Sequence, residues 1–198
     1  MASDETVAPD STPERLLLRR HTDGDSEAFP ELMALYRSQV FSYIVRCGVH
    51  PSHRDDVFQE IFLAVHRNAS SYNSSRALEP WLFTITANSV RTYFRRQKVR
   101  SIVEHDTERA DSPTTFSAAD ESLAQETARW VEREIAKLPL AQREVLTLCC
   151  MRDISQSDVA EILQMPVNTV KTHLSRGRAA LAKALARRNL TIHREAAV

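Results

Sequence analysis

The segment from Ile154 to Leu181 constrains the fold more than any other, because a proline divides it into two helical patterns. In its first half, apolar residues between Val159 and Leu163 recur at helical spacing after Ser155, a residue type that favours the N-cap. Pro166 cannot continue that helix, but it suits the first turn of a new one. The segment therefore predicts two short helices joined by a tight turn.

The second of these helices has one apolar and one basic side. Val170, Leu174 and Leu181 form a sparse apolar stripe, and no Asp or Glu occurs from Pro166 to Arg194. An ordinary helical hairpin with a solvated face is the alternative, but such faces usually mix both signs of charge. A helix-turn-helix that binds DNA is the favoured interpretation. Its candidate DNA-binding residues are Asn168, Thr169, Lys171, Thr172, Ser175, Arg176 and Arg178.

Composition favours an all-α protein of one domain or two small ones. The 198 residues include only three glycines, while Ala, Leu, Arg and Glu are frequent. No apolar run approaches the roughly 20 residues that a membrane helix needs. The acidic N-terminus has no apolar core and is not a signal peptide. We therefore expect a cytoplasmic protein with no direct membrane insertion.

The cysteines indicate neither a metal site nor a disulfide framework. Cys47, Cys149 and Cys150 are an odd number without metal-ligand spacing, and the last two lie in an apolar run. Buried free thiols in a reducing cytosol are favoured over a redox role. No metal and no cofactor is expected.

The net charge of zero conceals three blocks of charge. The segments Val90–Arg100 and Lys171–Arg194 are basic, whereas Ser101–Ala128 is acidic and almost free of large apolar residues. This middle block predicts a flexible linker. The predicted organisation is a disordered arm (1–13), a first helical domain (14–100), an acidic flexible linker (101–128) and a second helical domain (129–192).

Within the first domain we expect three long helices. The first starts near Asp25 and ends near Gly48, and the second covers Ser52–Asn68. A polar loop, Ala69–Pro80, leads into the third, which Trp81 opens. In the second domain, the predicted elements are a helix around Trp130, a break at Pro139, a helix over Gln142–Met151, the helix-turn-helix, and a basic tail that contains Arg187 and Arg188.

Two surfaces of the first domain are candidate binding sites. The second helix places four residues at i, i+3, i+4 and i+7, which form either a partner-binding ridge or a solvated face: Asp56, Gln59, Glu60 and Leu63. The third helix interleaves Tyr93 and Phe94 with arginines. Rings stack on bases and guanidinium groups pair with phosphates, so nucleic acid is favoured over a basic helix end stabilised by the helix dipole.

In this arrangement the chain resembles the extracytoplasmic-function sigma factors of bacteria over nearly its whole folded length. The segment DDVFQEIFL, from Asp55 to Leu63, is similar to the family's polymerase-docking helix. EPWLFTITANSVRTYFRRQK, from Glu79 to Lys98, is similar to its promoter-melting helix. The segment Leu138–Leu181 resembles the family's region four.

The resemblance implies that RNA polymerase core enzyme, promoter DNA and an anti-sigma factor are partners. The ridge around Asp56 would bind the core enzyme, and the helix-turn-helix would bind the minus-thirty-five element in duplex form. The first domain would hold the minus-ten element as a single strand, with a flipped base caught by a polar loop. The residues implied for the minus-ten element are Ser71, Tyr72, Asn73, Ser74, Arg76, Asn88, Arg91, Arg95 and Arg96.

Two other functions are weighed against this one. A stand-alone helix-turn-helix transcriptional regulator would bind duplex DNA without polymerase and would not need Tyr72, Trp81 or the ridge. An enzyme with Cys149 or Cys150 as nucleophile is disfavoured, because an apolar surrounding raises a thiol's pKa instead of activating it. We therefore expect no catalytic residues.

Overall fold

The described part of the chain is helical throughout. In the computed structural model the described residues are 12–103, 123–152 and 154–195, and they contain no strand. The prediction of an all-α fold is therefore confirmed. The helices are α1 (Pro13–Thr22), α2 (Ala28–Arg46), α3 (Arg54–Asn68), α4 (Leu78–Val103), α5 (Leu123–Ala136), α6 (Leu140–Leu146), α7 (Gln156–Leu163) and α8 (Val167–Glu195).

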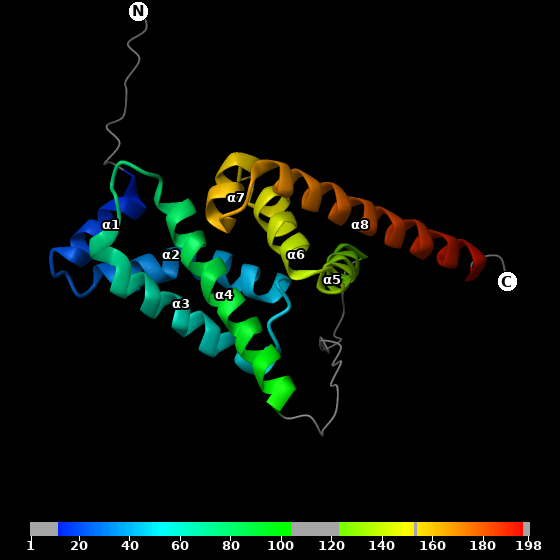
Figure 1. Cartoon of the computed structure of the whole chain (residues 1–198), viewed down its shortest axis with the longest axis horizontal. Coiled ribbons are helices and arrows are strands. Elements are labelled where there is room, and N and C mark those ends of the chain that lie inside the picture. The colour runs from blue at the N-terminus through cyan, green and yellow to red at the C-terminus, as the bar shows by residue number, and fades with distance from the viewer. Residues whose placement is uncertain (1–11, 104–122, 153, 196–198) are drawn as a thin grey trace, which may run out of the picture.

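Helices α1 to α4 form a bundle, in which α4 crosses α2 and runs alongside α3 (Figure 1). The apolar face predicted for the first long helix points into its core, where Leu32, Val40 and Ile44 are completely buried. Burial of each such side chain contributes roughly 1.5–3 kcal/mol. Helix α2 ends where the sequence predicted, because Gly48 adopts a left-handed φ of +80° that other residues rarely tolerate.

Helices α5 to α8 form a second unit around the predicted helix-turn-helix. The break at Pro139 is confirmed, since α6 begins directly after it and continues into a π-helical turn, Thr147–Met151. The Ser155 hydroxyl accepts a hydrogen bond of 3.1 Å from the Asp158 backbone and caps α7 as predicted. After Gln164 turns the chain with a φ of 52°, α8 starts at Val167.

The predictions for the second unit need three corrections. The recognition helix is not short, because α8 runs for 29 residues. Arg187 and Arg188 therefore lie in this helix and not in a tail, and the Arg188 guanidinium stacks on Trp130 at 5.2 Å. Cys150 is exposed, whereas Cys47 is buried and Cys149 half-buried.

The two units pack against each other, which the sequence did not predict. Helix α4 contacts α7, and α2 contacts α5 and α6, so that one apolar core continues from the first unit into the second (Figure 1). The predicted linker, 101–128, is shorter at both ends, because α4 continues to Val103 and α5 begins at Leu123. The predicted arm falls almost entirely outside the described residues, as does the middle of the linker.

Candidate nucleic-acid interface

Helix α8 presents its basic face to solvent because its other face is buried. Val170, Leu174 and Gly177 pack toward α6 and α7. The residues predicted to bind duplex DNA lie on the remaining surface of the helix. Six are exposed (Asn168, Lys171, Thr172, Ser175, Arg176 and Arg178), and Thr169 is half-buried.

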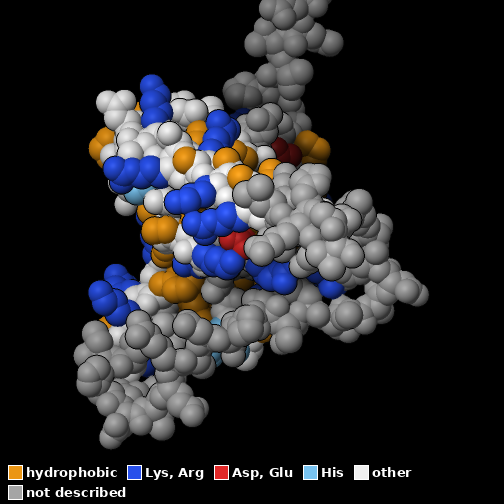
Figure 2. All heavy atoms as spheres, turned by 90° about the vertical axis from the view of Figure 1, so that its right-hand side faces the viewer, with side chains coloured by type: hydrophobic (Ala, Val, Ile, Leu, Met, Phe, Trp, Pro, Cys, Tyr) orange, Lys and Arg blue, Asp and Glu red, His pale blue; other side chains and the backbone are white. Residues whose placement is uncertain are grey.

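Two local contacts distinguish members of this face. The Thr172 hydroxyl donates to the Asn168 carbonyl at 2.8 Å, so its lone pairs still face outward as acceptors. The Arg178 guanidinium lies 3.5 Å from the Cys150 thiol, at the edge of the face nearest α6. Figure 2 looks onto the side of the molecule from which α8 projects and shows many Lys and Arg side chains with few acidic ones among them. Such a face suits a polyanion.

A groove of about 590 Å³ runs between α3 and α4. It collects predicted residues from both candidate surfaces of the first domain: Glu60, Leu63, Ser71, Asn88 and Arg96. Arg96 crosses its rim and pairs with the Glu60 carboxylate at 2.8 and 3.1 Å. Polar groups thus line both walls, while Trp81 and Ile85 supply apolar surface.

The loop between α3 and α4 is held in place by its own side chains. The Tyr72 ring lies 5.2 Å from the Trp81 ring, and its hydroxyl donates to the Arg76 carbonyl. The Asn73 side-chain oxygen accepts hydrogen bonds from both the backbone nitrogen and the hydroxyl of Ser75, at 3.0 and 2.8 Å. Ser74 is exposed at the tip. This loop lines a second cavity, of about 730 Å³, with α7 on its far side.

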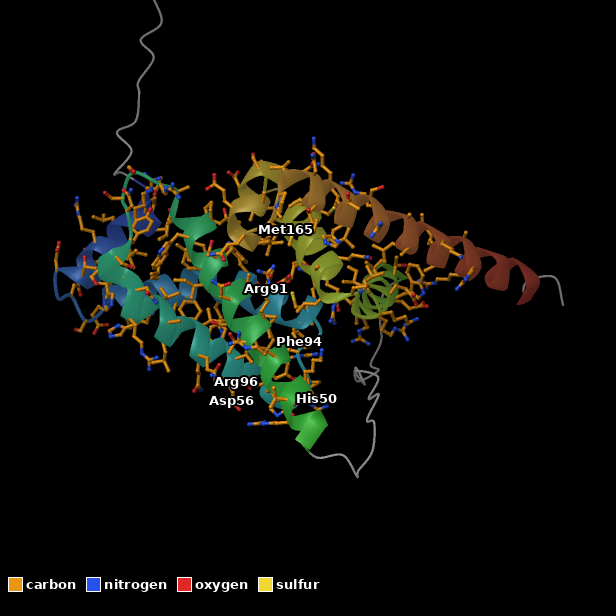
Figure 3. All side chains as sticks on the ribbon, viewed as in Figure 1. His50, Asp56, Arg91, Phe94, Arg96 and Met165 are labelled. Atoms are coloured by element: carbon orange, nitrogen blue, oxygen red, sulfur yellow. The ribbon has the colours of Figure 1, made fainter. Side chains whose placement is uncertain are left out.

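The three arginines of α4 that were predicted to bind the minus-ten strand lie apart. Arg96 is in the groove, as described above, and Arg95 is exposed. Arg91 instead points to the second unit, where Glu144 accepts two hydrogen bonds of 2.9 Å from its guanidinium (Figure 3). The groove therefore contains one of the three.

Sequence reasoning missed five polar residues that line the groove: Arg67, Asn68, Thr84, Ser89 and Thr92. A signal for Thr84 and Thr92 was present, because Trp81, Thr84, Asn88 and Thr92 follow one another at three- and four-residue spacing on α4. That spacing places polar side chains in a row on one face of the helix. Arg67 belongs to α3, and its spacing of four from Leu63 continues the ridge.

The predicted ridge on α3 is solvent-exposed over its whole length. Asp56, Gln59 and Glu60 are exposed, and Leu63 shows 52% of its surface. An exposed leucine next to carboxylates suits a partner surface that offers both an apolar pocket and basic groups. The ridge and the groove share Glu60 and Leu63, so the two sites adjoin.

The described residues contain no candidate metal cluster, and burial disfavours a reactive thiolate at Cys149. No three His, Cys, Asp or Glu side chains in this part of the chain are placed to hold a metal ion. Burial raises the pKa of the Cys149 thiol, which disfavours the reactive thiolate. None of the described helices has the length and apolar character needed to cross a membrane.

Comparison with protein families matches the two helical units separately. The family model described as Sigma-70 region 2 matches residues 32–100, and the one described as Sigma-70, region 4 matches residues 128–181. The first match covers α3 and α4 with the groove between them, and the second covers the helix-turn-helix. A stand-alone helix-turn-helix regulator would have no reason to carry the first.

Individual relatives extend the match over most of the chain. The ECF RNA polymerase sigma factor SigM of Mycobacterium tuberculosis is 31% identical over 169 residues, 85% of this chain and 83% of that protein. SigW of Bacillus subtilis is 28% identical over 82% of this chain and 91% of its own. In fold, the sigma factor RpoE crystallised with the anti-sigma factor NepR from Bartonella quintana matches with a TM-score of 0.65, at 20% identity over 80% of this chain and 96% of that one. The chain belongs to the extracytoplasmic-function (ECF) family of RNA polymerase sigma factors.

Proposed function

We propose that two surfaces of this sigma factor divide promoter recognition between them. The family function is initiation of transcription at specific promoters, and polymerase core enzyme performs the bond-forming chemistry. The face of α8 would bind the minus-thirty-five element as a duplex. The α3–α4 groove, with its adjoining loop, would hold the minus-ten element as a single strand.

The α8 surface supports duplex binding by its shape and charge. A helix fits the major groove, and Arg or Lys can contact guanine edges or phosphates while Asn contacts adenine. Arg176 and Lys171 supply the cations, and Asn168 stands near the N-terminus of the helix, the part that a helix-turn-helix places against bases.

The single observation that carries the minus-ten proposal is the convergence of Ser71, Asn88 and Arg96 in one groove. A flipped base costs a few kcal/mol to extract, and stacking with hydrogen bonds must offset this cost. Hydroxyl and amide groups can bind base edges, Arg96 can bind a phosphate, and Trp81 offers an aromatic surface. The contacts of Tyr72 and Asn73 hold the loop rigid beforehand, which lowers the entropy lost on binding.

The exposed α3 ridge is the proposed contact with core polymerase. Its carboxylates would pair with basic groups of the core enzyme, and Leu63 would fill an apolar pocket. An anti-sigma factor is a proposed second partner, because the structurally similar sigma factor RpoE of Bartonella quintana was solved in complex with the anti-sigma factor NepR. We propose that the protein has no catalytic activity of its own and acts in the cytoplasm, where polymerase is found.

Promoter binding, melting and transcription in vitro with core enzyme test whether the α8 face binds the minus-thirty-five element and the α3–α4 groove the minus-ten element. Arg176→Ala and Lys171→Ala should each weaken binding to a minus-thirty-five duplex, by about 1–3 kcal/mol for a bidentate base contact. Asn73→Ala, or alanines from Tyr72 to Ser75, should spare this binding but reduce permanganate reactivity of unpaired thymines. A pre-melted template should then partly restore transcription. Normal melting by the loop variants would contradict the minus-ten assignment.

A further inference from the structure

One buried carboxylate joins the two units of the molecule. Glu144, on α6, is 1% exposed and receives three hydrogen bonds of 2.9–3.2 Å from Arg91 of α4. The Tyr43 hydroxyl of α2 lies 3.4 Å from the same carboxylate. A further Arg91 nitrogen donates to the Leu163 carbonyl at the end of α7, at 3.0 Å. Arg91 therefore binds two helices of the second unit at once.

The arrangement is asymmetric in its burial. The Glu144 side chain is almost fully enclosed, whereas the Arg91 side chain is 30% exposed. Burial raises the pKa of the Glu144 carboxyl despite the opposing effect of Arg91. A buried carboxylate that loses its cation is strongly destabilising, but the same site tolerates an uncharged replacement. Contact between the units thus depends on Arg91 while Glu144 is charged, and loss of Arg91 should do far less harm where Glu144 is replaced by an uncharged residue.

Other contacts across this boundary are also charged. Arg152 of the second unit pairs with Glu79 of α4 and stacks on Phe83 at 5.4 Å. The Arg143 guanidinium lies 5.3 Å over Phe94 and reaches the end of α2 so closely that a Cβ at Gly48 would collide with it. Charged groups regain hydration when they separate, so a boundary rich in them can open reversibly.

The closed arrangement cannot span a promoter. The centres of the minus-ten and minus-thirty-five elements are roughly 25 base pairs apart, which is about 85 Å of duplex at ~3.4 Å per pair. The longest helix, α8, has 29 residues and measures about 43 Å. The groove and the α8 face belong to units in direct contact. Simultaneous use of both surfaces requires the units to separate.

We propose that the Arg91–Glu144 pair is a latch that keeps the free chain closed, with its two DNA-binding surfaces too near each other to engage one promoter. This inference rests on the proposed function for its consequence, but the latch itself is a property of the free chain. Core polymerase binds the ridge of the first unit and holds the second unit elsewhere, and so opens the latch. Arg91 is then a residue that positions the units, and its role precedes contact with DNA.

Fluorescence energy transfer in the full chain measures the closed state directly. Dyes are placed on cysteines that replace Leu35 of α2 and Leu185 of α8, which are 48% and 45% exposed, in a Cys149→Ser, Cys150→Ser background. Arg91→Ala should lower the closed-to-open ratio about tenfold or more, as expected for loss of hydrogen bonds to a charged group. Arg95→Ala, which removes an exposed arginine of the same helix, should leave the ratio unchanged.

A second substitution at Glu144 distinguishes the loss of a latch from general destabilisation of the fold. Adding Glu144→Gln to Arg91→Ala removes the unpaired charge and should restore much of the transfer. Circular dichroism monitors folding, and if Arg91→Ala unfolds, Arg91→Lys should open the chain to a smaller extent, because it keeps the charge without the paired geometry. Unchanged transfer in the Arg91 variants, or opening that Glu144→Gln does not reverse, would overturn the latch.

The same samples distinguish this inference from the proposed function. Core polymerase should reduce transfer in the unsubstituted chain, and Arg91→Ala should still support transcription from a promoter in vitro. If the chain opens as expected but never supports transcription with core enzyme, the latch holds and the proposed function fails. If transcription is normal and Arg91→Ala stays closed, the proposed function holds and the latch fails.

Discussion

Gly177 provides a quantitative test of how α8 is held against α6. It lies on the apolar stripe of α8, between Leu174 and Leu181. A Cβ at this position would come within 2.7 Å of Leu146 Cδ1 and 3.0 Å of its Cγ. The perturbation we choose is Gly177→Ala, which adds one methyl group to this contact.

Two opposing effects set the expected free energy of unfolding. Alanine is favoured over glycine inside a helix by roughly 0.5–1 kcal/mol. Against this, an added methyl group in a packed interior costs about 1–3 kcal/mol, because neighbours must leave their preferred rotamers. Leu146 is 3% exposed and has little room to move. The cost of the steric overlap should exceed the gain in helix propensity, and we expect the free energy of unfolding to fall by about 1 kcal/mol.

Urea unfolding followed by tryptophan fluorescence measures this loss. Trp130 of α5 stacks with Arg188 of α8, so in a Trp81→Phe background it reports the second unit. Ala179→Gly, at an exposed position two residues along α8, is the matched control because it measures the helix-propensity effect without a packing contact. Its expected cost is roughly 0.8–1 kcal/mol.

A second substitution tests the contact itself. Leu146→Ala alone should cost about 2–5 kcal/mol by opening a cavity. Combined with Gly177→Ala it should cost less than the sum, because the new methyl group occupies part of that cavity. If Gly177→Ala were instead stabilising by the full propensity difference, or if the two changes were additive, the close approach of α6 and α8 would be refuted.

Three further predictions follow from the described contacts. Ser155→Ala should destabilise the second unit by about 1 kcal/mol in urea unfolding through loss of the α7 cap, and no change would contradict the cap. Glu144 faces Arg91, Tyr43, Arg143 and Cys47, and burial raises the pKa of its carboxyl above the ordinary value of 4.5. The contribution of Glu144 to the stability of the fold is therefore complete below pH 4.5 and is lost as pH rises through the folded-state pKa. The stability of Glu144→Gln relative to the unsubstituted chain should therefore improve between about pH 4 and pH 7, and a decline would mean that Arg91 outweighs burial. Iodoacetamide should modify the exposed Cys150 in the folded protein and spare Cys47, because burial shields the Cys47 thiol and raises its pKa. Equal modification rates of the two thiols, measured by mass spectrometry, would contradict this difference in burial.

Local signals in the sequence predicted most helix boundaries correctly. Gly48, Pro139, Ser155 and Pro166 each act through their own backbone or hydroxyl chemistry, so their effects do not depend on distant residues. The exposed α3 ridge and the α8 face were predictable for a similar reason, since helical spacing alone decides which residues share a side. The residue roles assigned to those surfaces remain predictions.

The length of α8 was not predictable from the same signals. Beyond Leu181 the sequence is basic and has few large apolar residues, a pattern that also suits a solvated tail. Two contacts with α5 hold the helix there: Arg188 stacks on Trp130 and pairs with Glu126 at 2.9 Å. Their partners lie about 60 positions earlier in the chain, so no local window could include both.

The pairing of Arg91 with Glu144 shows most clearly what the sequence did not predict. Arg91 stands in one basic run with Arg95 and Arg96, and composition treats the three as equivalent. Helical geometry separates Arg91 from Arg96 by five residues, or about 140° around α4, so one points to α6 while the other reaches the groove. Which direction leads to DNA and which to Glu144 depends on how the units pack. The Glu144 carboxylate, with which Arg91 pairs, lies in the segment REVLTL, whose pattern predicts only a helix. A basic run is therefore a set of candidates for nucleic-acid contact, and the packed structure adds which member also pairs with a buried acid.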